Sequence, residues 1–196
     1  MIIEIRGVGF ANKGAELMLA SILDRLRQTI PEARFVVSPY IGPFERRAQY
    51  GLFQKFDVRQ AGRKGINIEK LMHAGYRSRY GFVSDSEIDV VLDASGFALG
   101  DQWKAEWIEE TARQFMQWKD QGKKIVLLPQ AFGPFENPAI RVAARMALES
   151  ADLVFPRDEE SYKLVRELVS SHQRLYQAPD FTNLLPGIVP DTLDLG

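Results

Sequence analysis

The sequence predicts an α/β protein with a doubly wound, mainly parallel, Rossmann-like sheet and helices on both faces. Two observations lead to this prediction. Short apolar segments alternate along the 196 residues with segments of helical periodicity, and a loop rich in glycine, proline or polar residues follows each of five apolar segments. Apolar strands that alternate with helices of ten or more residues are typical of a parallel sheet buried on both faces. With 45% hydrophobic residues, the chain is able to bury a sizeable core.

Two strand–helix units are expected in the first part of the chain. The segment "IIEIR", residues 2–6, has the pattern of a short strand, and from Ala15 apolar residues follow helical spacing until Pro31. The segment "RFVVSP", residues 34–39, predicts a second strand, and "FERRAQYGLF" predicts the helix after it. Residues 55–88 mix glycines with basic and aromatic residues, and the element expected there is a helix over residues 66–79.

Three further units follow in the second part. The segment "DVVLDA" predicts a strand over residues 89–93, before a helix over residues 107–118. The segments "KIVLLP" and "DLVFP" predict strands over residues 124–129 and 152–156. Helices are expected after these strands, over "AIRVAARMALES" and "EESYKLVRELVS".

Composition narrows the functional classes. The 25 basic and 26 acidic residues leave a formal net charge of −1, so no global attraction favours nucleic acid or an anionic membrane. The chain has no cysteine, which excludes disulfides, thiolate metal sites and a cysteine nucleophile and fits a reducing compartment. No apolar segment is long enough to span a bilayer, and "MIIEIRG" has the pattern of a strand and not of a signal peptide. We expect a cytoplasmic protein with a Rossmann-like domain over residues 1–180 and a tail or interdomain linker over residues 181–196.

Ligands of such a sheet bind outside the carboxyl ends of the strands, so the loops that follow strands are the candidate sites. In the first loop, "GVGFANKG", Gly7 and Gly9 begin a dinucleotide-binding pattern, but Asn12 stands where the third glycine belongs. The second strand also ends without the acidic residue that would hold a ribose, and the G-K-[ST] of a P-loop is missing. We therefore expect neither NAD nor another cofactor, and no metal.

The same loop is expected to begin the first helix. Asn12 is a plausible N-cap, and Gly14 would allow close approach to helix N–H groups that bind an anion or a sugar hydroxyl. A glycine turn with a purely structural cap is an equal alternative.

The loop "SGFALGDQW" carries a second group of candidates. Ser95 and Gly96 are small, so a ligand is able to touch the backbone there. The carboxylates of Asp93 and Asp101 are suited to accept hydrogen bonds from sugar hydroxyls or to act as a base. An aspartate in a glycine-rich loop is also a common turn former, so this alternative stays open.

Further candidates follow the next two strands. Gln130 ends a predicted strand, and Gly133 then makes a constrained turn with the proline after it. Trp103 and Trp107, which follow the preceding loop, are interpreted as packing residues and not as a platform for a sugar.

Arg157 directly follows the last predicted strand, so its guanidinium is expected at the carboxyl edge of the sheet, facing a cleft. A guanidinium there binds a carboxylate or phosphate through two parallel hydrogen bonds, which lysine does not reproduce. The alternative is an ion pair with Asp180 or Asp93. Asp158 is expected to cap the next helix, with Ser161 three residues on.

Five segments, in order, resemble the polysaccharide pyruvyl transferase family: "NKGAE", "SGFALGD", "LPQAFGPF", "RDEES" and "APD". The resemblance spans almost the whole chain, with the motifs at strand ends. It implies a GT-B-like architecture of two Rossmann-like halves facing across a cleft. It also implies transfer of the enolpyruvyl unit of phosphoenolpyruvate onto a saccharide acceptor as a ketal.

The resemblance also implies site residues. Arg157 and Asp158 match the family's segment R-D-x-x-S. Gln130 and Gly133 match its turn G-Q-x-x-G-P, and Asn12, Gly14 and Glu16 match its segment N-x-G-D-E. The match departs from the family in that Pro129 replaces the first glycine of the turn and Ala15 replaces an acid. Gly133 also stands where some members have a histidine, so a proton donor is expected to be absent from this half.

Pyruvyl transfer requires a general acid, a base and cationic groups for the two anionic ends of phosphoenolpyruvate. Arg157 is the expected clamp for one anionic end, and Asp93 or Asp101 the expected base. His73 and His172 lie in no motif and are expected to be surface or packing residues.

The chain ends, with "GIVPDTLDLG", about where the family crosses to its second half. The resemblance therefore implies an amino-terminal half that is inactive alone and that pairs with a second half-domain or forms a homo-oligomer. Two other classes stay open. One is a GT-B-like glycosyltransferase half-domain, which would bind a nucleotide sugar; the other is a non-catalytic module that binds saccharide or another chain.

Overall fold

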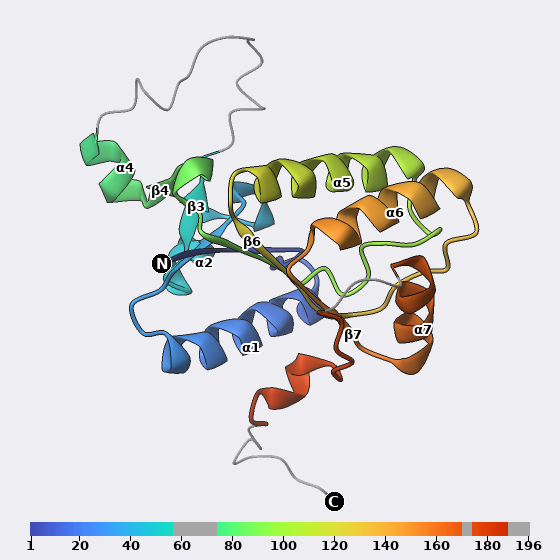
Figure 1. Cartoon of the computed structure of the whole chain (residues 1–196). Coiled ribbons are helices and arrows are strands. Elements are labelled where there is room, and N and C mark those ends of the chain that lie inside the picture. Colours follow the sequence, from blue (N-terminus) through green and yellow to red (C-terminus); the bar gives the residue numbers. More distant parts are fainter. Residues whose placement is uncertain (57–73, 170–173, 188–196) are drawn as a thin grey trace, which may run out of the picture.

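The computed structural model describes residues 1–56, 74–169 and 174–187. Within them, seven strands form one sheet in the order β4-β3-β2-β1-β5-β6-β7, and every neighbouring pair is parallel (Figure 1). The strands are β1 Ile2–Arg6, β2 Arg34–Val37, β3 Phe53–Lys55, β4 Phe82–Val83, β5 Val90–Asp93, β6 Lys124–Gln130 and β7 Leu153–Pro156.

Helices cover both faces of the sheet. Helix α1 lies on one side, and α5 and α6 lie together on the other (Figure 1). The α-helices are α1 Lys13–Thr29, α2 Phe44–Gln49, α4 Ala74–Tyr80, α5 Ala105–Asp120, α6 Pro138–Ser150 and α7 Glu159–Leu168. The described residues also form three short 3-10 helices, η1 Pro39–Ile41, η3 Asp85–Glu87 and η4 Phe181–Leu184. The fold is thus the α/β, Rossmann-like architecture that the sequence predicts.

Two apolar clusters fill the two sides of the sheet. Ile3 and Ile5 of β1 pack with Leu19 and other buried residues of α1, while buried residues of α5, α6 and α7 form the cluster on the opposite face. Successive side chains of a strand point to opposite faces, so Glu4 and Arg6 lie on the side of α5. β1 therefore has an apolar face toward α1 and a charged face toward α5.

The strand order reverses between β1 and β5. Strands β1 to β4 extend outward in one direction, and β5, β6 and β7 then extend from the other side of β1. In open parallel sheets, ligands bind outside the carboxyl ends of the strands at this reversal, the topological switch point. The loops after Arg6 and after Asp93 are therefore the expected location of a ligand-binding site.

Five strands and four of the helices after them confirm the sequence predictions to within about two residues. The helix predicted over residues 44–53 is shorter than expected: α2 ends at Gln49, and Phe53 begins β3. β3 and β4 were not predicted; they have three and two residues, too few to show a pattern. Of the helix expected over residues 66–79, residues 66–73 lie outside the described residues, and α4 begins at Ala74.

The end of the described chain lies against the domain. The 3-10 helix η4 lies beside α1, and Phe181 packs against the apolar cluster on that face. The division into a domain over residues 1–180 and a tail or linker stays a prediction. Among the described residues, no helix has the length and apolar character needed to cross a membrane.

Candidate functional site

The loops after β1 and β5 touch at the switch point. Gly7 follows β1 with φ +76°, and a Cβ at this position would overlap the backbone and the hydroxyl of Ser95. Only glycine allows this approach, because it has no Cβ and adopts positive φ at little cost. Ser95 is thereby placed directly beside the end of β1.

The amino terminus of α1 adjoins the same loop. Asn12 caps the helix, since its Oδ1 accepts from the backbone N–H groups of Gly14 at 2.8 Å and Ala15 at 3.4 Å. One turn further on, Met18 Cε lies 3.0 Å from where a Cβ of Gly96 would stand. The expected cap is thus present and close to the β5 loop, and the role of Asn12 and Gly14 in ligand binding stays a prediction.

Hydrogen bonds join the β5 loop to the loop after β6. The N–H of Ala131 donates to the carbonyl of Gly96 at 3.0 Å, and the N–H of Gly133 donates to that of Leu99 at 2.9 Å. Gln130 is 1% exposed, and its Oε1 accepts from Ala98 N at 3.3 Å. Its Nε2 has no hydrogen-bond partner within the described residues, so this donor is left for a water molecule or a ligand.

The backbone of Arg157 adjoins Gln130, because Arg157 N donates to the Gln130 carbonyl at 3.0 Å. Its side chain is 39% exposed, and Nε lies 3.8 Å from Asp158 Oδ2. The alternative that pairs Arg157 with Asp180 or Asp93 is wrong. Asp93 pairs with Arg6, and Asp180 accepts from the N–H and hydroxyl of Thr182. In the described part of the chain, the Arg157 guanidinium makes no hydrogen bond.

Asp158 caps α7 as expected, with Oδ1 accepting from Ser161 N at 2.8 Å. The hydroxyl of Ser161 in turn accepts from Phe132 N at 3.0 Å. These bonds fix the start of α7 against the β6 loop. The loops with Asn12, Ser95, Gly96, Gln130 and Arg157 therefore form one continuous edge, which is the convergence that their positions after strands predicted.

Both candidate base residues make structural hydrogen bonds. Asp93 is 1% exposed; its Oδ1 accepts from Ser95 N at 3.0 Å, and Oδ2 lies 3.1 Å from Arg6 Nε. Asp101 is half-buried, and its Oδ2 accepts from Glu136 N at 2.7 Å. A catalytic role for either carboxylate stays a prediction, and Asp101 is the more accessible of the two.

Trp103 and Trp107 lie at the start of α5 and stack on one another, with ring centroids 5.7 Å apart. Trp103 is 39% exposed and donates from Nε1 to the Phe97 carbonyl, while Trp107 is 61% exposed. Trp107 thus packs on Trp103 as expected, but much of its side chain stays exposed.

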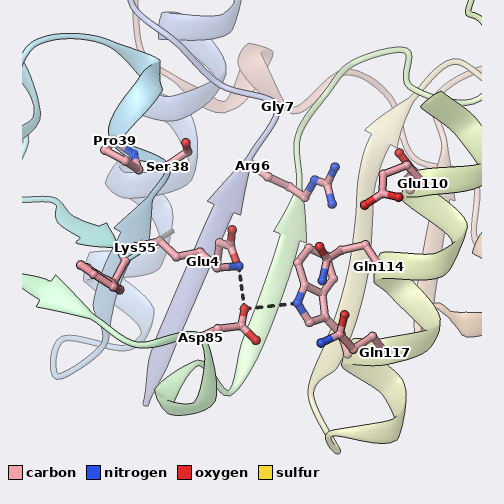
Figure 2. Close-up of a pocket in the computed structure, with 13 residues that line it drawn as sticks. Glu4, Arg6, Gly7, Ser38, Pro39, Lys55, Asp85, Glu110, Gln114 and Gln117 are labelled. Carbon is pink, nitrogen blue, oxygen red and sulfur yellow. Dashed lines mark hydrogen bonds and ion pairs between the residues drawn. The ribbon is translucent and has the colours of Figure 1, made fainter. Parts of the chain in front are cut away.

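A pocket of about 500 Å³ lies between β1 and α5 (Figure 2). Arg6 extends from β1 toward α5, where Glu110 and Gln114 lie, and Gly7 joins the pocket to the switch point. No residue of this pocket was predicted as a site residue. A signal was present in "MIIEIRG", because charged residues at every second position are unusual in a strand buried on both faces.

Charged groups form the floor of this pocket. Lys55 Nζ lies 2.7 Å from both Glu4 Oε2 and Asp85 Oδ1, and the buried Lys123 Nζ lies 2.8 Å from Asp85 Oδ2. Burial alone would raise the pKa of Asp85, but hydrogen bonds from Lys123 and Lys55 outweigh it and hold the pKa below its ordinary value of 3.8. Burial lowers the pKa of Lys123, an effect that Asp85 partly opposes. Asp85 is thus held as a carboxylate.

The fold and this edge define a Rossmann-like α/β domain with its polar loops gathered at the switch point. The family model for polysaccharide pyruvyl transferase matches residues 12–194, so the chain belongs to this family. No curated protein matches the chain. Within the described residues, no group of three histidine or acidic side chains is placed to hold a metal ion.

The structure is also similar to the crystal structure of Anabaena Alr3699/HepE in complex with UDP and glucose, with a TM-score of 0.50 and 13% identity. The match covers 91% of this chain and 44% of that chain. At this identity the similarity concerns the fold alone. The chain thus spans less than half the length of that structural neighbour.

Proposed function

We propose that the chain is the amino-terminal half of an enzyme that transfers pyruvyl from phosphoenolpyruvate to two hydroxyls of a saccharide. The observation that supports this proposal most directly is the position of Arg157. Its backbone is fixed to Gln130 at the carboxyl edge, while its guanidinium is half-exposed and only loosely paired with Asp158. A guanidinium so placed is suited to bind one anionic end of phosphoenolpyruvate through two hydrogen bonds. The cytoplasm is the proposed compartment, because the chain has no cysteine.

The reaction sets the remaining requirements. The methylene carbon of the donor gains a proton, a sugar hydroxyl adds to the carbon that bears the phosphate, and phosphate leaves as the second hydroxyl closes the ketal. A base must accept the hydroxyl protons, and Asp101 fits this role better than the buried Asp93. No acid is assigned among the described residues; His73 and His172 lie outside them.

The proposal includes a second half that faces the carboxyl edge, either a second half-domain or another copy of this chain. The 44% coverage of the structural neighbour's chain supports a larger whole. Charges at an open edge are screened by water, where a pair of unit charges about 4 Å apart is worth only about 1 kcal/mol. We therefore expect weak phosphoenolpyruvate binding and no turnover from residues 1–196 alone.

The test is phosphate release from phosphoenolpyruvate in the presence of a saccharide acceptor, measured on residues 1–196 and on a longer form that contains a second half. In the active form, Arg157→Ala is expected to lower kcat/KM about a hundredfold or more, as does the loss of other positioned transition-state donors. Arg157→Lys should recover little, because it keeps the charge without the planar fork. Arg141→Ala, which removes an exposed arginine from α6, is the matched control.

Robust turnover by residues 1–196 would contradict the need for a second half. Near-wild-type activity of Arg157→Ala would show that Arg157 does not bind the anionic donor. A thermal-shift screen with nucleotide sugars tests the glycosyltransferase alternative: stabilisation by a nucleotide sugar and not by phosphoenolpyruvate would favour it. Binding of saccharide without phosphate release in the longer form would favour a non-catalytic module.

A further inference from the structure

Gln130 lies where the loops after β5, β6 and β7 meet. Its side chain is 1% exposed, and Oε1 accepts from Ala98 N of the β5 loop at 3.3 Å. Its backbone carbonyl accepts from Arg157 N, which directly follows β7, at 3.0 Å. The same residue therefore contacts two loops through two different groups, the β5 loop through its side chain and the β7 loop through its backbone.

The contact with Ala98 is part of a row of hydrogen bonds that joins the β5 loop to the β6 loop. On one side of it, Ala131 N donates to the carbonyl of Gly96 at 3.0 Å. On the other side, Gly133 N donates to the carbonyl of Leu99 at 2.9 Å. Both of these bonds join backbone groups, whereas the N–H of Ala98 donates to a side-chain amide. That amide thus completes the row that fixes this part of the β5 loop.

The orientation of the Gln130 amide follows from the same contact. A carboxamide turned the other way would set its NH2 group against the N–H of Ala98, so that two donors would face each other without an acceptor. Oε1 is therefore held toward the β5 loop, although Nε2 has no hydrogen-bond partner within the described residues. The amide contributes an acceptor for the loop in addition to filling space.

The segment that Gln130 holds leads directly to Asp101, the proposed base, which lies three residues after Ala98. Asp101 N donates to the carbonyl of Pro134 at 3.0 Å. Gly100 has no room for a side chain, because a Cβ there would lie 2.5 Å from the carbonyl oxygen of Gly133. The β5 loop therefore lies close against the β6 loop as far as Asp101, and a shift at Ala98 displaces the carboxylate relative to the rest of the edge.

We infer that Gln130 is a positioning residue for pyruvyl transfer: its side chain sets the β5 loop, and with it Asp101, relative to the anion site at Arg157. This inference rests on the proposed function, since that function assigns the base and the anion site. Loss of the side-chain acceptor then affects the saccharide, whose hydroxyl Asp101 deprotonates. Binding of phosphoenolpyruvate is unaffected, because the backbone carbonyl that holds Arg157 N remains in every variant.

Gln130→Met tests this role in residues 1–196. Methionine is unbranched like glutamine and of similar size. It leaves the N–H of Ala98 without an acceptor but also removes the unsatisfied Nε2, so one unsatisfied donor replaces another and the variant is expected to fold. In ¹⁵N-labelled protein, hydrogen exchange of the Ala98 amide should become about three- to tenfold faster, while the amides of Gly133 and Arg157 keep their rates.

Two further variants serve as controls. Gln130→Glu retains an oxygen toward Ala98, and burial favours its neutral carboxyl, so exchange at Ala98 should stay close to wild type. Gln28→Met makes the methionine substitution on the exposed face of α1 and should leave the β5 loop unchanged. The inference fails if Gln130→Met folds without faster exchange at Ala98, or if the Arg157 amide accelerates equally. It also fails if Gln130→Glu, with the acceptor retained, accelerates exchange at Ala98 about tenfold, an outcome that decides the matter even if Gln130→Met does not fold.

Kinetics of the longer form test the consequence for the reaction. Gln130→Met is expected to raise the KM for the saccharide about three- to tenfold and to leave the KM for phosphoenolpyruvate unchanged. A loss of folded protein would lower the apparent kcat and change neither KM, so the difference between the two substrates separates positioning from stability. Equal changes in both KM values, or none, would overturn the inference and leave the proposed function standing. A longer form without pyruvyl transfer, in which Gln130→Met still accelerates exchange at Ala98, would overturn the proposed function and leave the hold on the β5 loop in place.

Discussion

Arg6 and Asp93 face each other at the last paired position of β1 and β5, with Nε and Oδ2 3.1 Å apart. Asp93 is 1% exposed, so water cannot stabilise its charge and the guanidinium must do so. The second carboxylate oxygen accepts from Ser95 N and holds the turn out of β5. This ion pair therefore joins the two strands at the switch point and fixes the start of the candidate site.

Arg6→Met is expected to lower the free energy of unfolding by about 3 kcal/mol, because it leaves the Asp93 charge buried without a counter-ion. Arg6→Met with Asp93→Asn should cost less than the sum of the two single changes, because the double variant buries no lone charge. Urea denaturation measures all three. Arg141→Ala controls for loss of an arginine at the surface; if Arg6→Met costs no more than this control, the ion pair does not support the switch point.

The lowered pKa of Asp85 leads us to expect that the stability of the fold depends on pH. Its folded-state pKa lies below the ordinary 3.8, so the unfolded state binds more protons and stability falls as the pH drops through this range. Asp85→Asn leaves Lys123 buried and poorly paired, and it should cost about 1–3 kcal/mol at pH 7. The difference from the wild type should shrink as the pH falls below about 3.8, because the unfolded chain then takes up a proton at residue 85 that the folded chain resists. Denaturant titrations at pH 7 and pH 3 measure it.

The control for this prediction is Asp24→Asn, on the exposed face of α1, which should change stability by less than about 0.5 kcal/mol at either pH. A loss in Asp85→Asn that stays the same at pH 7 and pH 3 would show that the carboxylate's charge is not what stabilises the pocket floor.

Much of the fold could be predicted because its central strands are apolar and its helices are long. The segment "KIVLLP" and the helix after it carry a strong local pattern, whereas β3 and β4 are held mainly by neighbours in the sheet. A strand of two or three residues has too little sequence to show alternation. Its place in the sheet depends on contacts between segments far apart in the chain.

Site residues could be predicted from the sequence only where they lie in a loop that follows a strand. This rule located Asn12, Gln130 and Arg157 on one edge. It missed the pocket between β1 and α5, because Gln114 and Gln117 belong to a helix and line the pocket only once α5 has packed opposite β1. It also missed the pairing of Asp93 with Arg6, which depends on the register of β1 with β5 and not on any local motif.

Gly133 is expected to be intolerant of alanine for two reasons. Its φ is +82°, and a Cβ would lie 2.6 Å from Leu164 Cδ1. The backbone alone should cost about 1–2 kcal/mol, and the overlap should add about 1–3 kcal/mol. Gly122→Ala measures the backbone cost alone, because Gly122 has a φ of +79° and open space around it, so a Cβ there meets no neighbour. Thermal or urea unfolding compares the variants.

Leu164→Ala in the Gly133→Ala background should recover part of the loss by removing the overlap. Equal losses for Gly133→Ala and Gly122→Ala would mean that the contact with α7 does not constrain the turn after β6.

Asp101 offers a test that separates structure from catalysis at a single residue. Its carboxylate accepts from Glu136 N at 2.7 Å and Asn137 N at 3.4 Å, just before α6. Asp101→Ala removes both acceptors and should cost about 1–2 kcal/mol of stability, while Asp101→Asn keeps one carbonyl oxygen and should cost less. If Asp101 is the base, however, Asp101→Asn should lower kcat of the longer form about a hundredfold or more, since an amide does not accept the proton. Asp24→Asn is the control for charge. An Asp101→Asn variant with nearly normal kcat would confine Asp101 to holding the segment before α6 and leave the base to another residue.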